Sequence, residues 1–489
     1  MATPETAVAA LPAAPGRGPR DDAVPRIHDL LLRYGAEAAS VRCAGPALRH
    51  WLDAPPPEGT GACVCYADTG RAWVAAGSPL APDPLQARAA ARFVAAAREA
   101  GRRACFFAVE RRLPGLRSLA IGEQPAFAPA EWLSSGARSG RIREQLRRSR
   151  RKGVRVRRVP AADLREGTPL RTAVERIAAG WAAARRMEPL GFLVALDPFR
   201  RPGEHRYYVA ERDGEPVAFL SAVPLYARRG WLVEDLLRSA AAPNGTTEQL
   251  LVAFAREAGD SAVFTLGLAP LSSGGHLPAW QRAARALARP FYDFAGIRAF
   301  KERLHPTRWE PVWLAFPGDG PAALHVGDAL AAFAGGSPAR IALRTFLRRP
   351  AGPPWLISVM LVGWTAALGA LAAAGRPEPL GLDRAQLGLW ALFDALLAAL
   401  LFGAARRPRP GRLALAAGLA LADGVLYLHH LAGAAPPDAR LTPLRAIAAA
   451  SPLAAAAALA WAALLAARLR PAGVSRRSRR RRPPPGRCG

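Results

Sequence analysis

Lysine is almost absent from this chain of 489 residues: Lys152 and Lys301 are its only two lysines. An Ala-, Arg- and Pro-rich composition accounts for the preference for arginine, but it does not explain the formal net charge of +29. A positive field of this size favours a polyanionic partner, either nucleic acid or an anionic membrane surface. Because a compact ammonium enters pockets that a planar guanidinium cannot, the two lysines are candidates for special sites.

Cysteine is also scarce, and its spacing excludes a disulfide framework and a zinc site. A reduced, cytosolic environment fits this pattern best. Residues 1–24 have no apolar segment of the kind a signal peptide requires, so we predict a disordered leader there. No metal and no cofactor are predicted. The five cysteines are Cys43, Cys63, Cys65, Cys105 and Cys488.

The last third of the chain, residues 350–470, contains long apolar runs, each near the roughly 20 residues that a bilayer-spanning helix needs. Arginines gather before the first run, between the second and third, and in the tail 471–489. This alternation predicts a multi-pass membrane protein with a cytoplasmic soluble region and cytoplasmic termini. Asp394 and Asp423 fall near the middle of two runs, where a carboxylate is costly and suggests a function. The four predicted spans are 355–375, 386–405, 412–433 and 444–468.

The region before the spans alternates predicted strands and helices in two similar halves. In each half, a hairpin leads through a helix to a buried strand. This pattern predicts an α/β fold of tandem acyltransferase-like domains, 25–155 and 156–345, the first ending in an arginine-dense helix at 141–151. The predicted strands are 62–66, 72–76, 104–109, 207–210, 217–223, 231–237 and 262–266, and two further helices are predicted at 83–100 and from 246.

Several strings in this region resemble the C-terminal catalytic domain of phosphatidylglycerol lysyltransferases, the bacterial multiple peptide resistance factor family. They are EDLLR (234–238), APNGT (242–246), TLGLAPL (265–271), REQLRRSRRKGV (143–154), Trp181 to Met187 and, longest, FYDFAGIRAFKERLHPTRWEPVWLAF (291–316). The resemblance implies a tandem GNAT-like enzyme in the bacterial inner membrane. It implies transfer of an aminoacyl group from aminoacyl-tRNA to the glycerol hydroxyl of the anionic lipid phosphatidylglycerol.

The predicted strand 231–237 ends in acidic and basic residues just before a helix, where ligands bind in α/β layers. Asp235 and Arg238 are the catalytic candidates at this point. Strict alternation places Glu234 on the opposite face from Asp235, so one acid faces the cleft. Asp235 could hold the ammonium of the aminoacyl group, accept a proton, or only pair with Arg238.

Asn244, Thr246 and Glu248 open the following helix and are candidate substrate contacts or simple capping residues. The loop 238–245, RSAAAPNG, lacks the glycine-rich turn that holds pyrophosphate in acetyl-CoA-dependent relatives. This absence weakens the alternative of a CoA-dependent N-acyltransferase acting on a membrane substrate. A membrane-tethered binding protein without catalysis is a third hypothesis.

Lys301 lies in the longest family string and is predicted to bind a phosphate of the lipid or the tRNA. Its neighbours Tyr292, Arg298 and Phe300 are further candidate substrate contacts. Gly267 is predicted either to let a backbone approach closely at the end of a strand or to form a turn.

The arginine-dense helix carries the candidates for nucleic-acid or lipid phosphate contact. Neutralising phosphates would provide affinity and salt sensitivity, and anionic lipid competes with tRNA as the partner. These candidates are Arg143, Arg147, Arg148, Arg151 and Lys152.

Overall fold

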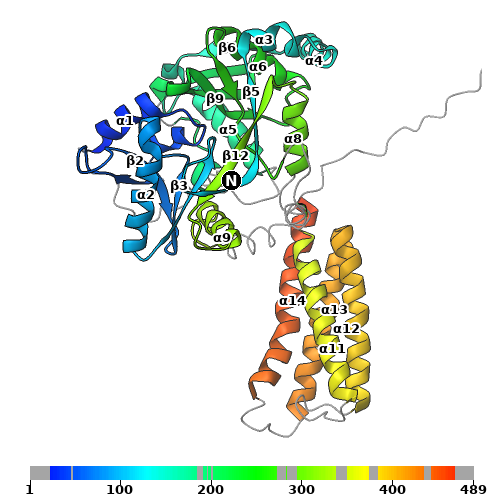
Figure 1. Ribbon diagram of the computed structural model, residues 1–489. Coiled ribbons are helices and arrows are strands. Elements are labelled where there is room, and N and C mark those ends of the chain that lie inside the picture. Colours follow the sequence, from blue (N-terminus) through cyan, green and yellow to red (C-terminus); the bar gives the residue numbers. More distant parts are fainter. Residues whose placement is uncertain are drawn as a thin grey trace, which may run out of the picture. The chain divides into compact units, whose positions relative to one another are not determined.

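The computed structural model forms two compact units, Met1–Ile341 and Ala342–Gly489, which we describe separately. Within them the structure describes residues 23–45, 48–183, 191–194, 196–199, 202–272, 282, 294–337, 350–373, 384–433 and 442–468. The first unit is the predicted soluble region, and the second contains the predicted spans (Figure 1).

A single mixed sheet organises the soluble unit. Its strands follow the order β1-β2-β3-β4-β12-β5-β10-β9-β8-β7-β6, with β11 pairing to β5. The strands are β1 (Arg49–Leu52), β2 (Cys63–Asp68), β3 (Ala72–Ala76), β4 (Arg103–Val109), β5 (Arg117–Phe127), β6 (Arg155–Val159), β7 (Arg206–Arg212), β8 (Glu215–Leu225), β9 (Gly230–Arg238), β10 (Val263–Thr265), β11 (Ala269–Pro270) and β12 (Arg308–Phe316).

Helices cover this sheet, and their apolar positions repeat with helical spacing. In α2, for example, Ala89, Phe93 and Ala97 are buried four residues apart, so they form one stripe against the sheet. The α-helices of this unit are α1 (Ala23–Tyr34), α2 (Asp83–Glu99), α3 (Pro129–Ser134), α4 (Gly140–Arg151), α5 (Pro169–Ala183), α6 (Thr246–Glu257), α8 (Phe294–Glu302) and α9 (Ala322–Phe333). Short 3₁₀ turns are η1 (Ser40–Ala44), η2 (Gly136–Arg138), η3 (Ala161–Leu164), η4 (Phe192–Val194), η5 (Pro202–Glu204) and η6 (Tyr226–Arg228).

The predicted internal repeat is confirmed in the sheet. In the first half, β2 and β3 pair antiparallel, and α2 carries the chain to β4, which runs parallel to β3. In the second half, β8 and β9 pair antiparallel, and α6 carries the chain to β10, parallel to β9. The doubled α/β fold was therefore predictable from hairpin and helix patterns.

The two halves are joined more closely than the predicted domains imply, because they exchange strands. Strand β12, from the second half, lies between β4 and β5, and β5, from the first half, pairs with β10. At this junction Phe127 and Phe264 stack with ring centroids 4.6 Å apart. Division into two domains at residue 155 would cut through one continuous sheet.

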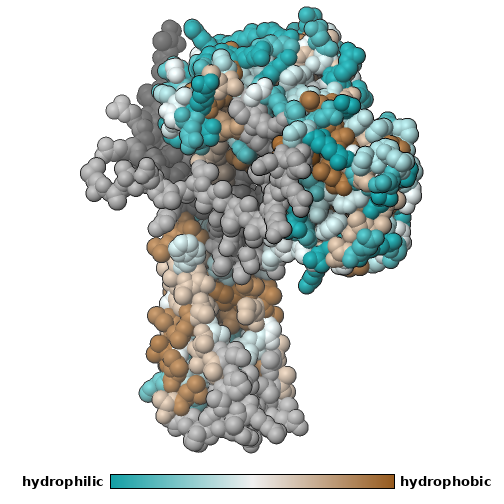
Figure 2. Space-filling model, turned by 90° about the vertical axis from the view of Figure 1, so that its left-hand side faces the viewer, coloured by the Kyte–Doolittle hydropathy of each residue, from teal (hydrophilic) through white to brown (hydrophobic). Residues whose placement is uncertain are grey.

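The second unit contains four helices that are long and apolar enough to cross a membrane. They agree with the four predicted spans, and their surface is mostly hydrophobic, in contrast to the largely hydrophilic soluble unit (Figure 2). Polar links inside the bundle include a hydrogen bond from Ser358 Oγ to the carbonyl of Ala398 (2.8 Å) and one from Trp390 Nε1 to Asp423 Oδ1 (2.6 Å). The helices are α11 (Gly352–Ala373), α12 (Arg384–Arg406), α13 (Pro410–Gly433) and α14 (Thr442–Arg468).

Candidate active site

A β-bulge places two acids close together near the end of β9. Ser221 on β8 pairs with Asp235, but the next residue, Ala222, pairs with Val233, so Glu234 is an extra residue in the register. Arg42 and His205 both contact Glu234, and they also lie close enough to act on Asp235. The prediction that Glu234 and Asp235 lie on opposite faces of the strand was therefore wrong, because the bulge interrupts strict alternation.

The environment of these acids is buried and polar. Ser221 Oγ donates to Asp235 Oδ2 at 2.6 Å, while Arg42 Nη2 lies 3.0 Å from Glu234 Oε1 and His205 Nε2 lies 3.3 Å from Glu234 Oε2. Burial, reinforced by the charge of Glu234, raises the pKa of Asp235 to about 6. The site therefore contains a carboxylate whose charge is incompletely balanced.

The hydroxyl of Tyr207 is buried near these acids and has no hydrogen-bond partner among the described residues. Burial raises the pKa of this phenol, so Tyr207 carries its proton at neutral pH. A buried hydroxyl without a partner costs free energy unless a ligand or water satisfies it. Tyr207 is thus an available donor next to the acidic site.

The two parallel strands at the centre of the second half separate early. Strand β10 pairs with β9 only through Gly230, Trp231 and Leu232, so the acidic part of β9 extends beyond the described partner strand. After β10 the chain turns away at Gly267, whose backbone has φ +69°, a conformation that favours glycine. This turn agrees with one of the two predicted roles of Gly267.

Lys301 holds this turn from α8. Its ammonium is buried and donates to the carbonyls of Leu266, Gly267 and Leu268 at 2.9, 2.7 and 3.0 Å. Three donated bonds require the protonated amine, although burial lowers the pKa of Lys301 to about 7. The prediction that Lys301 binds a phosphate is therefore wrong, because all three of its N–H groups already donate to backbone carbonyls. Lys301 instead positions the turn.

The other candidates around α8 that the structure describes are both partly buried. Arg298 lies 3.7 Å from the ring centroid of Trp309 and 3.5 Å from Glu123, while Phe300 packs against the hydrophobic core. Neither arrangement presents the side chain fully to solvent. Tyr292 lies outside the described residues.

The loop between β9 and α6 leaves Arg238 and Asn244 exposed. Thr246, in contrast, is buried, and its hydroxyl donates to the carbonyl of Pro243 at 2.7 Å. The hydroxyl proton of Thr246 is therefore used within the loop itself. Glu248 lies half-buried in the first turn of α6, where a carboxylate suits the helix dipole.

Helix α4 packs Ile142, Leu146 and Ser149 toward the protein and directs its arginines to solvent. Of these, Arg147 and Arg148 both pair with Glu144. The remaining candidates, Arg143, Arg151 and Lys152, are exposed.

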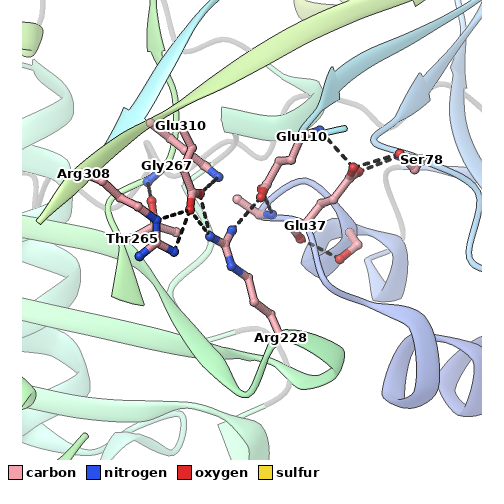
Figure 3. Close-up of polar contacts among 11 residues, drawn as sticks. Glu37, Ser78, Glu110, Arg228, Thr265, Gly267, Arg308 and Glu310 are labelled. Carbon is pink, nitrogen blue, oxygen red and sulfur yellow. Dashed lines mark hydrogen bonds and ion pairs between the residues drawn. The ribbon is translucent and has the colours of Figure 1, made fainter. Parts of the chain in front are cut away.

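Arg228 joins the two halves of the sheet through carboxylates from both (Figure 3). Its Nη1 donates to Glu110 Oε2 at 2.6 Å, and its Nη2 donates to both carboxylate oxygens of Glu310 at 2.6 and 2.5 Å. Burial, together with Glu37, raises the pKa of Glu110 to about 7. Sequence reasoning missed Arg228, as it missed Arg42, because nothing marks either among so many arginines.

Comparisons with known proteins identify the family. The family "Phosphatidylglycerol lysyltransferase, C-terminal" matches residues 20–316. A phosphatidylglycerol lysyltransferase of Bacillus subtilis is 31% identical over 155 residues, which are 29% of this chain and 17% of that protein. The lysylphosphatidylglycerol biosynthesis bifunctional protein LysX of Mycobacterium ulcerans is 30% identical over 143 residues, 29% of this chain and 12% of that protein. The chain thus matches only a small part of each curated relative.

Solved structures agree with this result. The C-terminal domain of a putative lysylphosphatidylglycerol synthetase from Agrobacterium fabrum has 25% identity and a TM-score of 0.55, covering 65% of this chain and 98% of that one. L-PGS from Bacillus licheniformis shares the fold, with 22% identity and a TM-score of 0.54, covering 68% and 99%. The chain belongs to the family of the phosphatidylglycerol lysyltransferase C-terminal domain.

Proposed function

We propose that this protein transfers an aminoacyl group from charged tRNA to the hydroxyl of an anionic membrane lipid, with phosphatidylglycerol as the acceptor. The observation that carries the proposal is the family match over residues 20–316, which includes the acidic end of β9. The names of the Bacillus and Mycobacterium relatives supply the lipid class. The four apolar helices keep the protein at its lipid substrate.

The proposed reaction exchanges one ester for another. The lipid hydroxyl oxygen attacks the ester carbonyl carbon, the bond to the tRNA ribose oxygen breaks, and the hydroxyl proton ends on that oxygen. Because the two esters are similar in energy, the protein mainly has to position both substrates and stabilise the developing oxyanion.

In this proposal Asp235 binds the ammonium of the aminoacyl group. Glu234 lies next to Arg42 and His205, whereas Asp235 accepts a hydrogen bond from the neutral hydroxyl of Ser221, so a bound ammonium would balance the charge of Asp235. The exposed Arg238 and the exposed cations of α4 then contact phosphates of the tRNA or the lipid. The arginine distribution around the spans supports a cytoplasmic position for the soluble unit, where charged tRNA is available.

The test uses the full-length protein in phosphatidylglycerol vesicles with tRNA charged with a panel of radiolabelled amino acids. Label should appear in the lipid fraction, and Asp235→Asn should lower the rate about 100-fold. Asp213→Asn is the matched control, because Asp213 is exposed on a hairpin at φ +53°, which asparagine accepts.

Two results would contradict the proposal. Consumption of acyl-CoA with the charged tRNA left intact would favour the CoA-dependent alternative. Binding of charged tRNA without loss of the ester would favour a binding protein.

A further inference from the structure

Helix α9 buries its polar side chains instead of exposing them. Arg103 at the start of β4 donates from Nε and Nη2 to the two carboxylate oxygens of Asp328, at 2.8 and 2.5 Å. His325 is also buried, and its ring stacks on Phe316 with centroids 4.7 Å apart. These are the only polar side chains in α9, so the helix keeps none for solvent.

The opposite face of α9 is apolar and open. Leu324 is 47% exposed and Leu330 is 57% exposed. Ala323 and Gly327 are exposed as well, and their spacing puts all four on one side of the helix. A contiguous exposed apolar face on a soluble unit indicates an interaction surface.

Helix α1 shows the ordinary pattern for comparison. It also exposes large apolar residues, Val24 and Leu32, but Arg26, Asp29 and Arg33 are exposed among them. Water solvates such a mixed face well. The apolar face of α9 therefore differs from that of a normal surface helix in the same unit.

The sequence after α9 indicates what covers this face. Residues 334–351 connect α9 to α11, the first of the four long apolar helices, and can reach at most about 60 Å at the length of an extended chain. This connection contains Arg340, Arg344, Arg348 and Arg349, which anionic head groups attract. The chain thus keeps α9 within reach of a bilayer surface.

We propose that the face formed by Ala323, Leu324, Gly327 and Leu330 lies in the head-group region of an anionic bilayer. An interfacial helix buries its apolar side only to the boundary of the acyl chains, which suits two leucines on a short helix. The soluble unit then has a second membrane contact besides its covalent connection to the spans. This inference depends on the membrane helices and not on the proposed aminoacyl transfer.

Site-directed fluorescence tests the inference on the full chain. Leu330→Cys in a Cys488→Ser background provides one accessible thiol, because Cys43, Cys63, Cys65 and Cys105 are at most 2% exposed. The thiol is labelled with an environment-sensitive fluorophore in phosphatidylglycerol-containing vesicles, with and without lipids that carry a quencher near the head group. Leu32→Cys on α1 is the matched control.

We expect strong lipid quenching and a blue-shifted emission at position 330, at least threefold above the quenching at position 32. Equal quenching at the two positions would overturn the proposal. Emission that is blue-shifted but depends on the protein-to-lipid ratio, without lipid quenching, would instead indicate a second copy of the chain and would also overturn it.

A charge variant provides an independent check. Leu324→Glu with Leu330→Glu should abolish most lipid quenching of a fluorophore at Ala323→Cys, while the melting temperature stays unchanged because both leucines are exposed. Unaltered quenching in this variant would contradict docking by α9. Neither readout involves tRNA, so failure here is distinguishable from failure of the proposed reaction.

Discussion

The two halves of the sheet have the same topology, but they differ in how far their two parallel strands stay paired. In the first half, β3 pairs with β4 along five residues, Ala72–Ala76, and its side chains are apolar and mostly buried. In the second half, β9 pairs with β10 along only three residues and carries Glu234 and Asp235 beyond that pairing. In the first copy, which we call the closed copy, the parallel strands stay paired and their side chains form part of the core. In the second copy the parallel strands separate, and the unpaired part of β9 carries the two acids.

This difference shows that an open strand end needs support from outside the strand. The supports in the second half are the bulge at Glu234, the partner Arg42 from η1, and the ammonium of Lys301 on the turn after β10. The repeat supplies the scaffold, and these added contacts supply the site. The following predictions test this comparison, beginning with the largest expected effect.

Placing an acid in the closed copy should disrupt the fold. Ala75 is fully buried on β3, and Ala75→Asp puts a carboxylate there without a designed partner. We expect the free energy of unfolding to fall by more than about 4 kcal/mol, the range for an unpaired buried charge. In contrast, Asp235→Asn should change it by only about 1 kcal/mol. Chemical denaturation in detergent measures both, and equal effects would contradict the comparison.

Removing the ammonium that holds the turn should impair transfer. Lys301→Met leaves three carbonyls without their donor, and Lys301→Arg replaces a compact ammonium with a planar group that does not fit the three acceptors. We expect both to lower the transfer rate on the order of 100-fold through misplacement of the site. Lys152→Arg, at the exposed second lysine, is the control and should retain activity. Full activity of Lys301→Arg would contradict the positioning role.

Lower pH should inactivate the site reversibly. Because the pKa of Asp235 is raised to about 6, its binding charge is present above that pH and is lost as the pH falls through it. The transfer rate at low substrate should therefore decrease about tenfold per pH unit below 6. A pH profile from 4.5 to 8 measures this decrease. A midpoint near 4, the ordinary value for aspartate, would disagree with a buried catalytic-site acid.

The smallest expected effect concerns the arginines of α4. Arg143→Gln with Arg151→Gln removes two exposed charges and should reduce the slope of log tRNA affinity against log salt by about 1 to 2. Arg71→Gln with Arg88→Gln, exposed on the closed half, changes the net charge equally and should leave the slope unaltered. Filter binding at several salt concentrations compares the two variants. Equal slopes for the two double variants would indicate that the nucleic acid does not bind at α4.

Periodic patterns predicted the repeated hairpin–helix–strand units and the four apolar helices, because these depend on local alternation and run length. They could not predict the bulge at Glu234, since a register shift is decided by the partner strand. The insertion of β12 between β4 and β5 was also hidden, because it joins segments far apart in the sequence. The scarcity of lysine correctly marked Lys301 as unusual, but only the structure shows that its partners are carbonyls.

The place of β12 has a consequence for biosynthesis. A nascent chain that ends before Arg308 lacks the strand that connects β4 to β5, so its first half cannot close even though all of β1 to β5 has been made. Pairing across so long a stretch is slow compared with local folding. The last strand of the sheet, β12, is therefore translated only shortly before α11, the first of the four long apolar helices. Assembly of the soluble unit thus coincides with delivery of the chain to the membrane.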